Sequence, residues 1–305
     1  YPGWCLAWVG VCGAVPAVFN MVGANVIRGE GYSLHAGLGL SLRGVLNIAL
    51  DPFFVLPFGL NMNIKGAAIA TLISNVVTTL YFAILLIVIR KKSVVSFSPK
   101  KACLAIKEKI ARNVLFTGLP SALQTMLSAV SNLVLNSLMI GYGETAEAAI
   151  GVTKKIHAVP FGMVTGLAQG AAPLIAYNNG AKKYDKMKTT LKLSLCYCVG
   201  LAITVLIVVE SAAGALIEVF IKDASTVTYG EKFLRLHCAS LPFMAVTFML
   251  VSYFQAVGAK GKAFLLSIIR KGIVDIPLMY LLNVLIPVYG IVACQPITDV
   301  ISATV

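Results

Sequence analysis

Residues 32–56 read YSLHAGLGLSLRGVLNIALDPFFVL, an apolar stretch with an acid near its far end. A helix needs roughly 20 apolar residues to cross the hydrocarbon core of a bilayer, and this stretch is long enough. Asp51 lies deep within it, and Pro52 follows directly. A bare carboxylate in hydrocarbon is costly, so an acid at this depth normally faces a cavity, a charged partner or a translocated ion. The stretch therefore predicts a membrane helix with a functional site inside it.

Composition places the whole chain in a membrane. Of its 305 residues, 58% are hydrophobic and 12% are charged, and the mean hydropathy is +0.88. A soluble domain usually carries about 25% charged residues. Nine apolar stretches are long enough to span a bilayer, and we expect an all-α, polytopic protein of the cell membrane. The stretches lie near residues 4–27, 32–56, 64–90, 114–140, 146–176, 188–217, 229–257, 262–285 and 287–305.

The distribution of lysine and arginine predicts the topology. Basic residues crowd the third, fifth and seventh connections between spans, whereas the even connections carry few. By the positive-inside rule the basic connections are cytoplasmic, so the Tyr1 end is expected outside. Residues 91–113 are then a basic cytoplasmic linker between an N-terminal lobe (1–90) and a C-terminal lobe (114–305). Most of the formal net charge of +13 is this topological signal, and no nucleic-acid partner is expected.

Prolines and glycines indicate an internal repeat. Four positions recur in the same order about 225 residues later: Pro16, Gly31, Pro52 and Gly66 match Pro242, Gly261, Pro277 and Gly290. Duplicated halves are common in secondary transporters, although glycine and proline are also frequent in membrane helices generally. If the repeat is real, the first three spans correspond to the last three. Three further helices before Tyr1 would then complete a twelve-helix, two-lobe bundle, of which this chain carries nine.

The residues around Asp51 suit a cation. Arg43, Asn47 and Asp51 are spaced by four residues and share one helix face. Asp51 can hold a proton or Na⁺, Asn47 offers an amide oxygen, and Pro52 removes a backbone donor and so frees a carbonyl. Hard cations prefer such oxygen ligands. The alternative is that Asp51 and Pro52 only cap a helix end at the outer interface.

The fourth span carries a polar stripe. It consists of Gln124, Ser128, Asn132 and Asn136. These side chains either line a wet substrate cavity or form hydrogen bonds between helices. Lys154 and Lys155 follow inside the next span, where long side chains can snorkel towards the interface, and Glu147 is a candidate partner by its spacing.

The last two spans contain two further candidates for a substrate cavity, Asp275 and Asp299. Asp275 lies four residues after Lys271, which predicts an intrahelical ion pair. The alternative for Asp275 is a secondary cation or substrate site in the C-terminal lobe. Asp299 follows Gln295-Pro296, and it is either a cavity acid or a buried packing residue.

Cysteine and histidine do not predict a metal site. The seven cysteines lie mostly inside spans without a C-x-x-C pair, and they are expected to be packing residues. His35, His157 and His237 are far apart in sequence and form no H-E-x-x-H motif. We expect no cofactor and no metal ion apart from Na⁺ at Asp51.

Three stretches resemble the multidrug and toxic compound extrusion (MATE) family, bacterial branch. They are NIALDPFFVLPFGLNMNIKGAAIATLIS (47–74), AQGAAPLIAYNNGAKKYDKM (168–187) and PVYGIVACQPITDVIS (287–302). The likeness extends over essentially the whole chain, as the fourth to twelfth helices of a twelve-helix transporter. It implies a monomeric antiporter with two six-helix bundles, which exports cationic amphipathic molecules by alternating access against inward flow of H⁺ or Na⁺.

The resemblance also implies a cation site. In this family the asparagine and aspartate of N-x-x-x-D-P bind the cation in the N-terminal lobe, and these match Asn47 and Asp51. A threonine of the next helix joins them, and Thr71 is its match. The family's further aspartate belongs to the first helix, which has no counterpart here.

Three other functions are alternatives. A lipid-linked oligosaccharide flippase of the same superfamily plan would need cavity lysines or arginines, for which Lys155, Arg43 and Arg270 are candidates. An integral-membrane enzyme is disfavoured because no G-x-S-x-G, metal triad or phosphate loop is present. A scaffold fragment without transport is the third.

Overall fold

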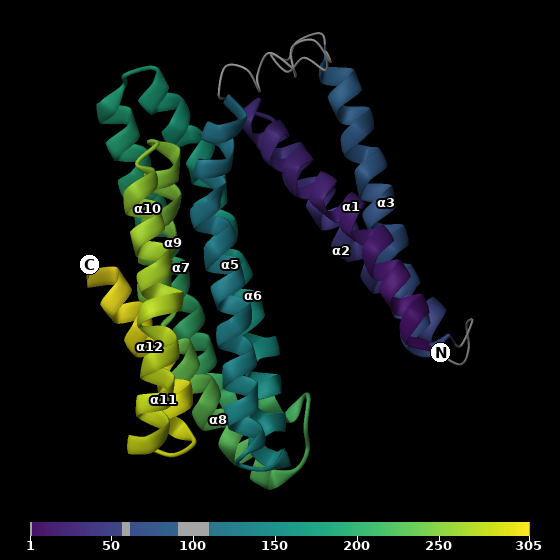
Figure 1. The fold of residues 1–305 in the computed structure, drawn as a ribbon, viewed down its shortest axis with the longest axis vertical. Coiled ribbons are helices and arrows are strands. Elements are labelled where there is room, and N and C mark those ends of the chain that lie inside the picture. The colour runs from purple at the N-terminus through teal and green to yellow at the C-terminus, as the bar shows by residue number, and fades with distance from the viewer. Residues whose placement is uncertain (1, 57–61, 91–109, 305) are drawn as a thin grey trace. The chain divides into compact units, whose positions relative to one another are not determined.

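The computed structural model describes residues 2–56, 62–90 and 110–304, and within these ranges the chain is helical apart from short turns, with no strand. Figure 1 labels the helices. The chain divides into two compact units, residues 1–104 and 105–305. Each unit is described separately below.

Unit 1 contains three helices that all pack against one another. They are α1 (Pro2–Gly29), α2 (Ser33–Val55) and α3 (Asn63–Ile89). The turn between α1 and α2 places Gly31 at φ +89°, a conformation that glycine adopts without steric cost. Phe82 of α3 is completely buried and packs with apolar residues of α1 and α2.

A buried amide network holds α1 against α3. Asn20 donates through Nδ2 to the backbone carbonyl of Asn75 at 3.0 Å, and the hydroxyl of Thr79 donates to Oδ1 of Asn20 at 2.9 Å. Polar groups removed from water are stable only when they find such partners. The network therefore fixes the relative position of α1 and α3.

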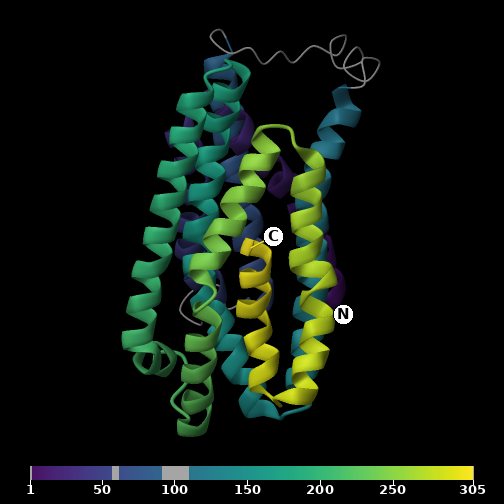
Figure 2. The same cartoon turned by 90° about the vertical axis from the view of Figure 1, so that its left-hand side faces the viewer.

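Unit 2 contains the remaining helices, and in Figure 2 α12 lies between the α8–α9 run and the α10–α11 run. The elements are α5 (Ile110–Ile140), α6 (Glu144–Gly180), α7 (Tyr184–Glu218), α8 (Ala224–Cys238), α9 (Leu241–Ala256), α10 (Lys260–Ile268), a π-helix η1 (Ile269–Ile273), α11 (Asp275–Leu285) and α12 (Tyr289–Thr304). The largest apolar core joins α6, α7, α8 and α9, and it includes the fully buried Met244 and Met249.

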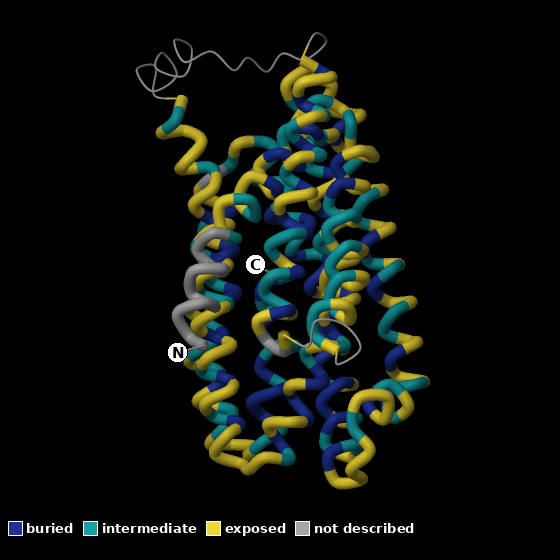
Figure 3. The backbone as a smooth tube through the Cα atoms, turned by 90° about the vertical axis from the view of Figure 1, so that its right-hand side faces the viewer, coloured by how far each residue is buried: buried dark blue, intermediate teal, exposed yellow. Residues whose placement is uncertain are grey.

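The outer surface is rich in apolar side chains, as expected of a protein surrounded by lipid. Exposed and buried residues alternate along the same helices (Figure 3). Val284 and Ile207 are 80% and 64% exposed. By length and composition, five helices of the described residues can cross a membrane, or six if the bent α8–α9 pair is one span. The prediction of an all-α, multi-pass membrane protein is confirmed.

The nine predicted spans fall on helical segments of the described residues, but three of them are not continuous regular helices. The span expected at 188–217 is kinked at Ala212 of α7, whose backbone angles are not helical. The span expected at 229–257 is split into α8 and α9, which are bent by 41°. Pro242, at the start of α9, has no N–H to continue the hydrogen-bond ladder, so the helix breaks there. The span expected at 262–285 is interrupted by the π-helix η1.

Gly66 and Gly290, which match in the proposed repeat, have similar surroundings in the structure. A Cβ on Gly66, near the start of α3, would lie 2.5 Å from the carbonyl oxygen of Phe54 in α2, and a Cβ on Gly290 in α12 would collide with the carbonyl oxygen of Leu282 in α11. Both glycines allow one helix to press against the end of the helix before it. The match of Gly31 to Gly261 is wrong, because the residue with positive φ is Gly258 and Gly261 lies inside α10.

We expect Gly290→Ala to destabilise the protein, because the added methyl group must displace backbone. Overpacking of this kind typically costs about 1–3 kcal/mol. Thermal unfolding of the purified full-length protein in detergent should show a midpoint several degrees lower. The matched control is Gly200→Ala in α7, where no atom lies within 4 Å of the new Cβ. Equal midpoints for the two variants would contradict the expected close approach.

Candidate functional site

Asn47, Asp51 and Thr71 meet in unit 1. Asn47 of α2 donates through Nδ2 to Oδ1 of Asp51 at 3.4 Å and to the hydroxyl oxygen of Thr71 at 3.3 Å. The Thr71 hydroxyl donates to the carbonyl of Ala67 at 2.9 Å, so its oxygen remains an acceptor towards Asn47. Asn47 and Asp51 are half-buried and Thr71 is exposed. The structure therefore brings together the three residues that the sequence predicted for a cation site.

Local structure explains this arrangement. A spacing of four residues stacks Asn47 and Asp51 on one face of α2, and the close packing at Gly66 brings α3, with Thr71, beside that face. Pro52 lies in the last turn of α2 and has no N–H. The carbonyl of Ile48, four residues earlier, therefore lacks its usual helical donor. The site brings together a carboxylate and an amide from α2 and a hydroxyl from α3.

Asp51 has no positively charged partner. None of the four ion pairs among the described residues includes it. Arg43 is eight residues earlier in α2, about 12 Å along a helix axis. An acid in an apolar helix without an ion-pair partner normally faces a water-filled cavity or a translocated ion.

The intramembrane acids Asp275 and Asp299 of unit 2 differ from Asp51, because each forms an ion pair. Arg270 of η1 donates through Nε to Oδ1 of Asp299 in α12 at 2.7 Å, and their side chains are 2% and 0% exposed. Gln295 donates to the second carboxylate oxygen of Asp299 at 3.0 Å. The Arg270 guanidinium also stacks on Phe248, 4.6 Å from the ring centroid. Asp299 is thus a buried packing residue, one of the two alternatives that the sequence left open.

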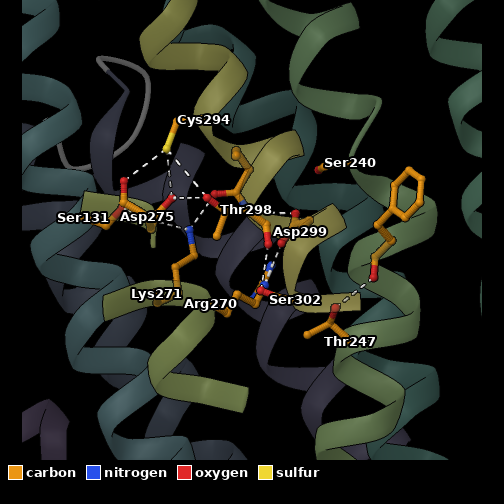
Figure 4. A network of polar contacts seen from close by, with 12 residues as sticks. Ser131, Ser240, Thr247, Arg270, Lys271, Asp275, Cys294, Thr298, Asp299 and Ser302 are labelled. Carbon is orange, nitrogen blue, oxygen red and sulfur yellow. Dashed lines mark hydrogen bonds and ion pairs between the residues drawn. The ribbon is translucent and has the colours of Figure 1, made fainter. Parts of the chain in front are cut away.

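Asp275 forms the second pair of the same network (Figure 4). Lys271 donates to Oδ2 of Asp275 at 3.1 Å and to Oε1 of Gln295 at 2.6 Å. Ser131 of α5 donates to the same carboxylate oxygen at 2.5 Å. The intrahelical pair predicted from the sequence therefore forms, and Gln295 links it to the pair of Arg270 and Asp299. The network ties α5, η1, α11 and α12 together.

A π-helix carries two consecutive buried basic residues. In η1 the N–H of Val274 bonds to the carbonyl of Ile269, five residues earlier. Arg270 and Lys271 are 2% and 9% exposed. Such bulges often mark functional positions. Sequence spacing alone gave no sign of it.

The polar stripe of α5 is not one surface. A step of four residues advances by about 40° around a helix, so three steps turn the stripe by about 120°. Gln124 is accordingly buried, Ser128 is half-buried, and Asn132 and Asn136 are exposed. Asn136 accepts a hydrogen bond from Nζ of Lys154 at 2.8 Å. Glu147, the partner considered for Lys154 from spacing, forms none of the ion pairs in the described ranges.

Sequence reasoning missed a pair of histidines. His157 of α6 and His237 of α8 are buried edge to face, with ring centroids 4.4 Å apart. They are 80 residues apart in the chain, so only the packing of α8 on α6 brings them together. Within the described part of the chain, no group of three or more histidine, cysteine or acidic residues could hold a metal ion.

These features define a multi-pass membrane protein with one unpaired acid site and one neutralised charge network. Residues 120–281, more than half of the chain, match the family model described as MatE, so the chain belongs to the MatE family.

Curated relatives and solved structures agree. Over 276 residues the chain is 32% identical to the multidrug export protein MepA of Staphylococcus saprophyticus and 29% identical to MepA of Staphylococcus haemolyticus, covering 90% of this chain and 59% of each relative. It thus spans about three fifths of these relatives. An outward-facing multidrug resistance MATE family transporter of the MOP superfamily is similar at 26% identity with a TM-score of 0.86, covering 98% of this chain and 66% of that one. A MOP superfamily transporter from Pyrococcus furiosus has a TM-score of 0.86 at 25% identity, over 98% of this chain and 67% of that one.

We expect Arg270→Met to destabilise the protein strongly, because it leaves the carboxylate of Asp299 buried without its cation. Removing one partner of a buried pair costs about 3–5 kcal/mol, whereas replacing both by apolar residues is often neutral. The double variant Arg270→Met/Asp299→Leu should therefore recover most of the thermal stability lost by the single variant. A double variant as unstable as the single one would show that the pair is not the stabilising element.

Proposed function

We propose that the protein to which this chain belongs is a cation-coupled antiporter, which exports cationic amphipathic molecules from the cell by alternating access. The observation that carries the proposal is Asp51, an acid in an apolar helix that has no ion-pair partner among the described residues. It lies beside the side-chain amide of Asn47, which also contacts the hydroxyl oxygen of Thr71. The names of the curated relatives, multidrug export proteins, support the substrate class. A binding site of this kind suits a transporter, whereas an enzyme would also need residues that carry out a reaction.

The coupling ion binds at Asp51. A proton neutralises the carboxylate directly. Na⁺ requires oxygen ligands instead, and a rotation of the Asn47 amide exchanges its donor for its oxygen towards the ion. In either case the charge of Asp51 is satisfied, and the chain relaxes around Pro52, where the backbone ladder is already interrupted.

Coupling follows from differential affinity. The ion binds from the outside and stabilises a state with low drug affinity, so the drug leaves outward, and the ion is released on return to the inward-facing state. Ion and drug must each change the affinity of the other by the same factor. In this proposal the connection around 91–113 faces the cytoplasm and the Tyr1 end faces outward, in the orientation that the basic connections favour.

The flippase alternative is less well supported. It needs free basic side chains to hold a pyrophosphate. Arg270, one of its three candidates, is already bound to Asp299 and is 2% exposed. The unpaired acid at Asp51 would also repel a pyrophosphate.

We expect Asp51→Asn to abolish cation-driven export, because an amide neither takes up the proton nor binds Na⁺ as a carboxylate does. The measurement is export of a fluorescent cation from proteoliposomes of the full-length protein after a pH jump and, separately, after a sodium jump. The control is Asp185→Asn, an exposed acid at the start of α7. Undiminished export by Asp51→Asn would refute the proposal.

The ion can be identified with Thr71→Val, which keeps the shape of the side chain but removes the hydroxyl oxygen. For a sodium-coupled protein the sodium concentration at half-maximal export should rise about tenfold, as expected for loss of one ligand worth roughly 1.4 kcal/mol. For a proton-coupled protein the pH dependence should be nearly unchanged, because a proton needs only the carboxylate. An unchanged response to both ions would exclude Thr71 as a sodium ligand.

A further inference from the structure

Lys154, like Asp51, forms no ion pair among the described residues. It lies ten residues after the start of α6, about 15 Å along the helix, and α6 is one of the helices long and apolar enough to cross a membrane. Its ammonium donates to Oδ1 of Asn136 on α5 at 2.8 Å. An ammonium has three N–H donors, so one contact leaves two of them for another group.

Each acid that could neutralise Lys154 is either in another ion pair or too far away. The buried acids of unit 2, Asp275 and Asp299, are paired with Lys271 and Arg270. Glu147 is exposed and two helical turns away along α6. Among the described residues no carboxylate lies within ion-pair distance of Lys154. Intramembrane charges normally pair with one another or face a water-filled cavity. Lys154 has no ion-pair partner among the described residues, so the cavity is the remaining option.

The surface around Lys154 suits a water-filled cavity. Asn132, Asn136 and Thr125 are exposed on α5, although a surface that meets lipid should be apolar there. On α6, Gly151 lies one turn before Lys154, and nothing lies within 4 Å of a Cβ built on it.

Apolar side chains border this polar surface. Leu133 and Ile140, three residues before and four after Asn136, are 67% and 58% exposed. Phe161, two turns after Lys154 on the same face of α6, is 39% exposed. The surface therefore offers a point charge, amide donors and apolar contacts within the reach of one small molecule, as ligand sites typically do.

We propose that Lys154 and Asn136 form a subsite for the anionic group of an amphipathic ligand, a carboxylate, sulfonate or phosphate. Asn136 accepts from Lys154 through Oδ1, and its amide nitrogen carries two further N–H donors on an exposed residue. Two donor groups, one of them charged, then converge on the anionic oxygens. The subsite extends the range of ligands from cations to zwitterions, and it rests on the proposed function only in that the ligand is a transported substrate.

Equilibrium binding tests the subsite without depending on coupling. The full-length protein is placed in nanodiscs of phosphatidylcholine and titrated with a fluorescent zwitterionic amphiphile and with its methyl ester, which lacks only the negative charge. The acid should bind about tenfold more tightly than the ester. Lys154→Met should abolish that difference, and Lys154→Arg should retain it. The matched control is Lys155→Met, an exposed neighbour, which should bind as the unmodified protein does.

A second arm identifies the source of the anionic group. Phosphatidylglycerol in the nanodiscs should leave acid binding unchanged if the occupant is a free ligand, and should weaken it if a lipid headgroup competes for the subsite. Either result requires Lys154, and both therefore support the subsite. Equal affinity for acid and ester in the unmodified protein, or a difference that persists in Lys154→Met, would overturn it. The latter is the result expected if Lys154 only snorkels.

Transport separates this inference from the coupling mechanism. Asp51→Asn should impair export of both acid and ester, because it removes the driving ion. Lys154→Met should impair export of the acid alone. Loss of both probes in Lys154→Met would contradict the subsite and leave the role of Asp51 untouched.

Discussion

A charge placed among apolar helices must be compensated, and this requirement organises unit 2. Arg270 and Asp299 are almost completely buried and 2.7 Å apart. Gln295 donates to the second carboxylate oxygen of Asp299, and the guanidinium stacks on the ring of Phe248. Lys271 and Asp275 repeat the arrangement and add Ser131. Buried ion pairs contribute little net stability but strongly disfavour any packing that separates them. The network therefore determines how α5, η1, α11 and α12 pack together, and it adds little to the net stability of the fold.

The same requirement explains why Asp51 and Lys154 differ from the paired charges. Each is held by an asparagine, Asn47 or Asn136, and neither forms an ion pair in the part of the chain that the structure describes. An amide can orient either charge because it has both a donor and an acceptor, but it neutralises neither. Asp51 of unit 1 and Lys154 of unit 2 therefore each lack an ion-pair partner among the described residues.

Sequence patterns predicted the elements well and the contacts between them less well. Hydropathy and segment length located the helical segments of the described residues. Helical spacing predicted both the Asn47–Asp51 contact and the pair of Lys271 and Asp275, because these are local interactions. The contact of Arg270 with Asp299 and the stacking of His157 on His237 depend on how helices pack, which spacing along one helix cannot reveal. The π-helix was missed for a related reason, because its basic residues Arg270 and Lys271 bind side chains of another helix.

The π-helix also bears on how the two halves of the repeat came to differ. With Pro52 matched to Pro277, the acid of unit 1 directly precedes its proline, whereas Asp275 lies one residue further from its proline. One residue is about 100° of rotation on a helix, and only Val274 separates η1 from Asp275. In a repeat of this kind, a change of register by a single residue is enough to turn an acid from an open face into a buried pair. Two halves with the same arrangement of helices can therefore place corresponding acids in different surroundings, so a symmetric fold does not require symmetric sites.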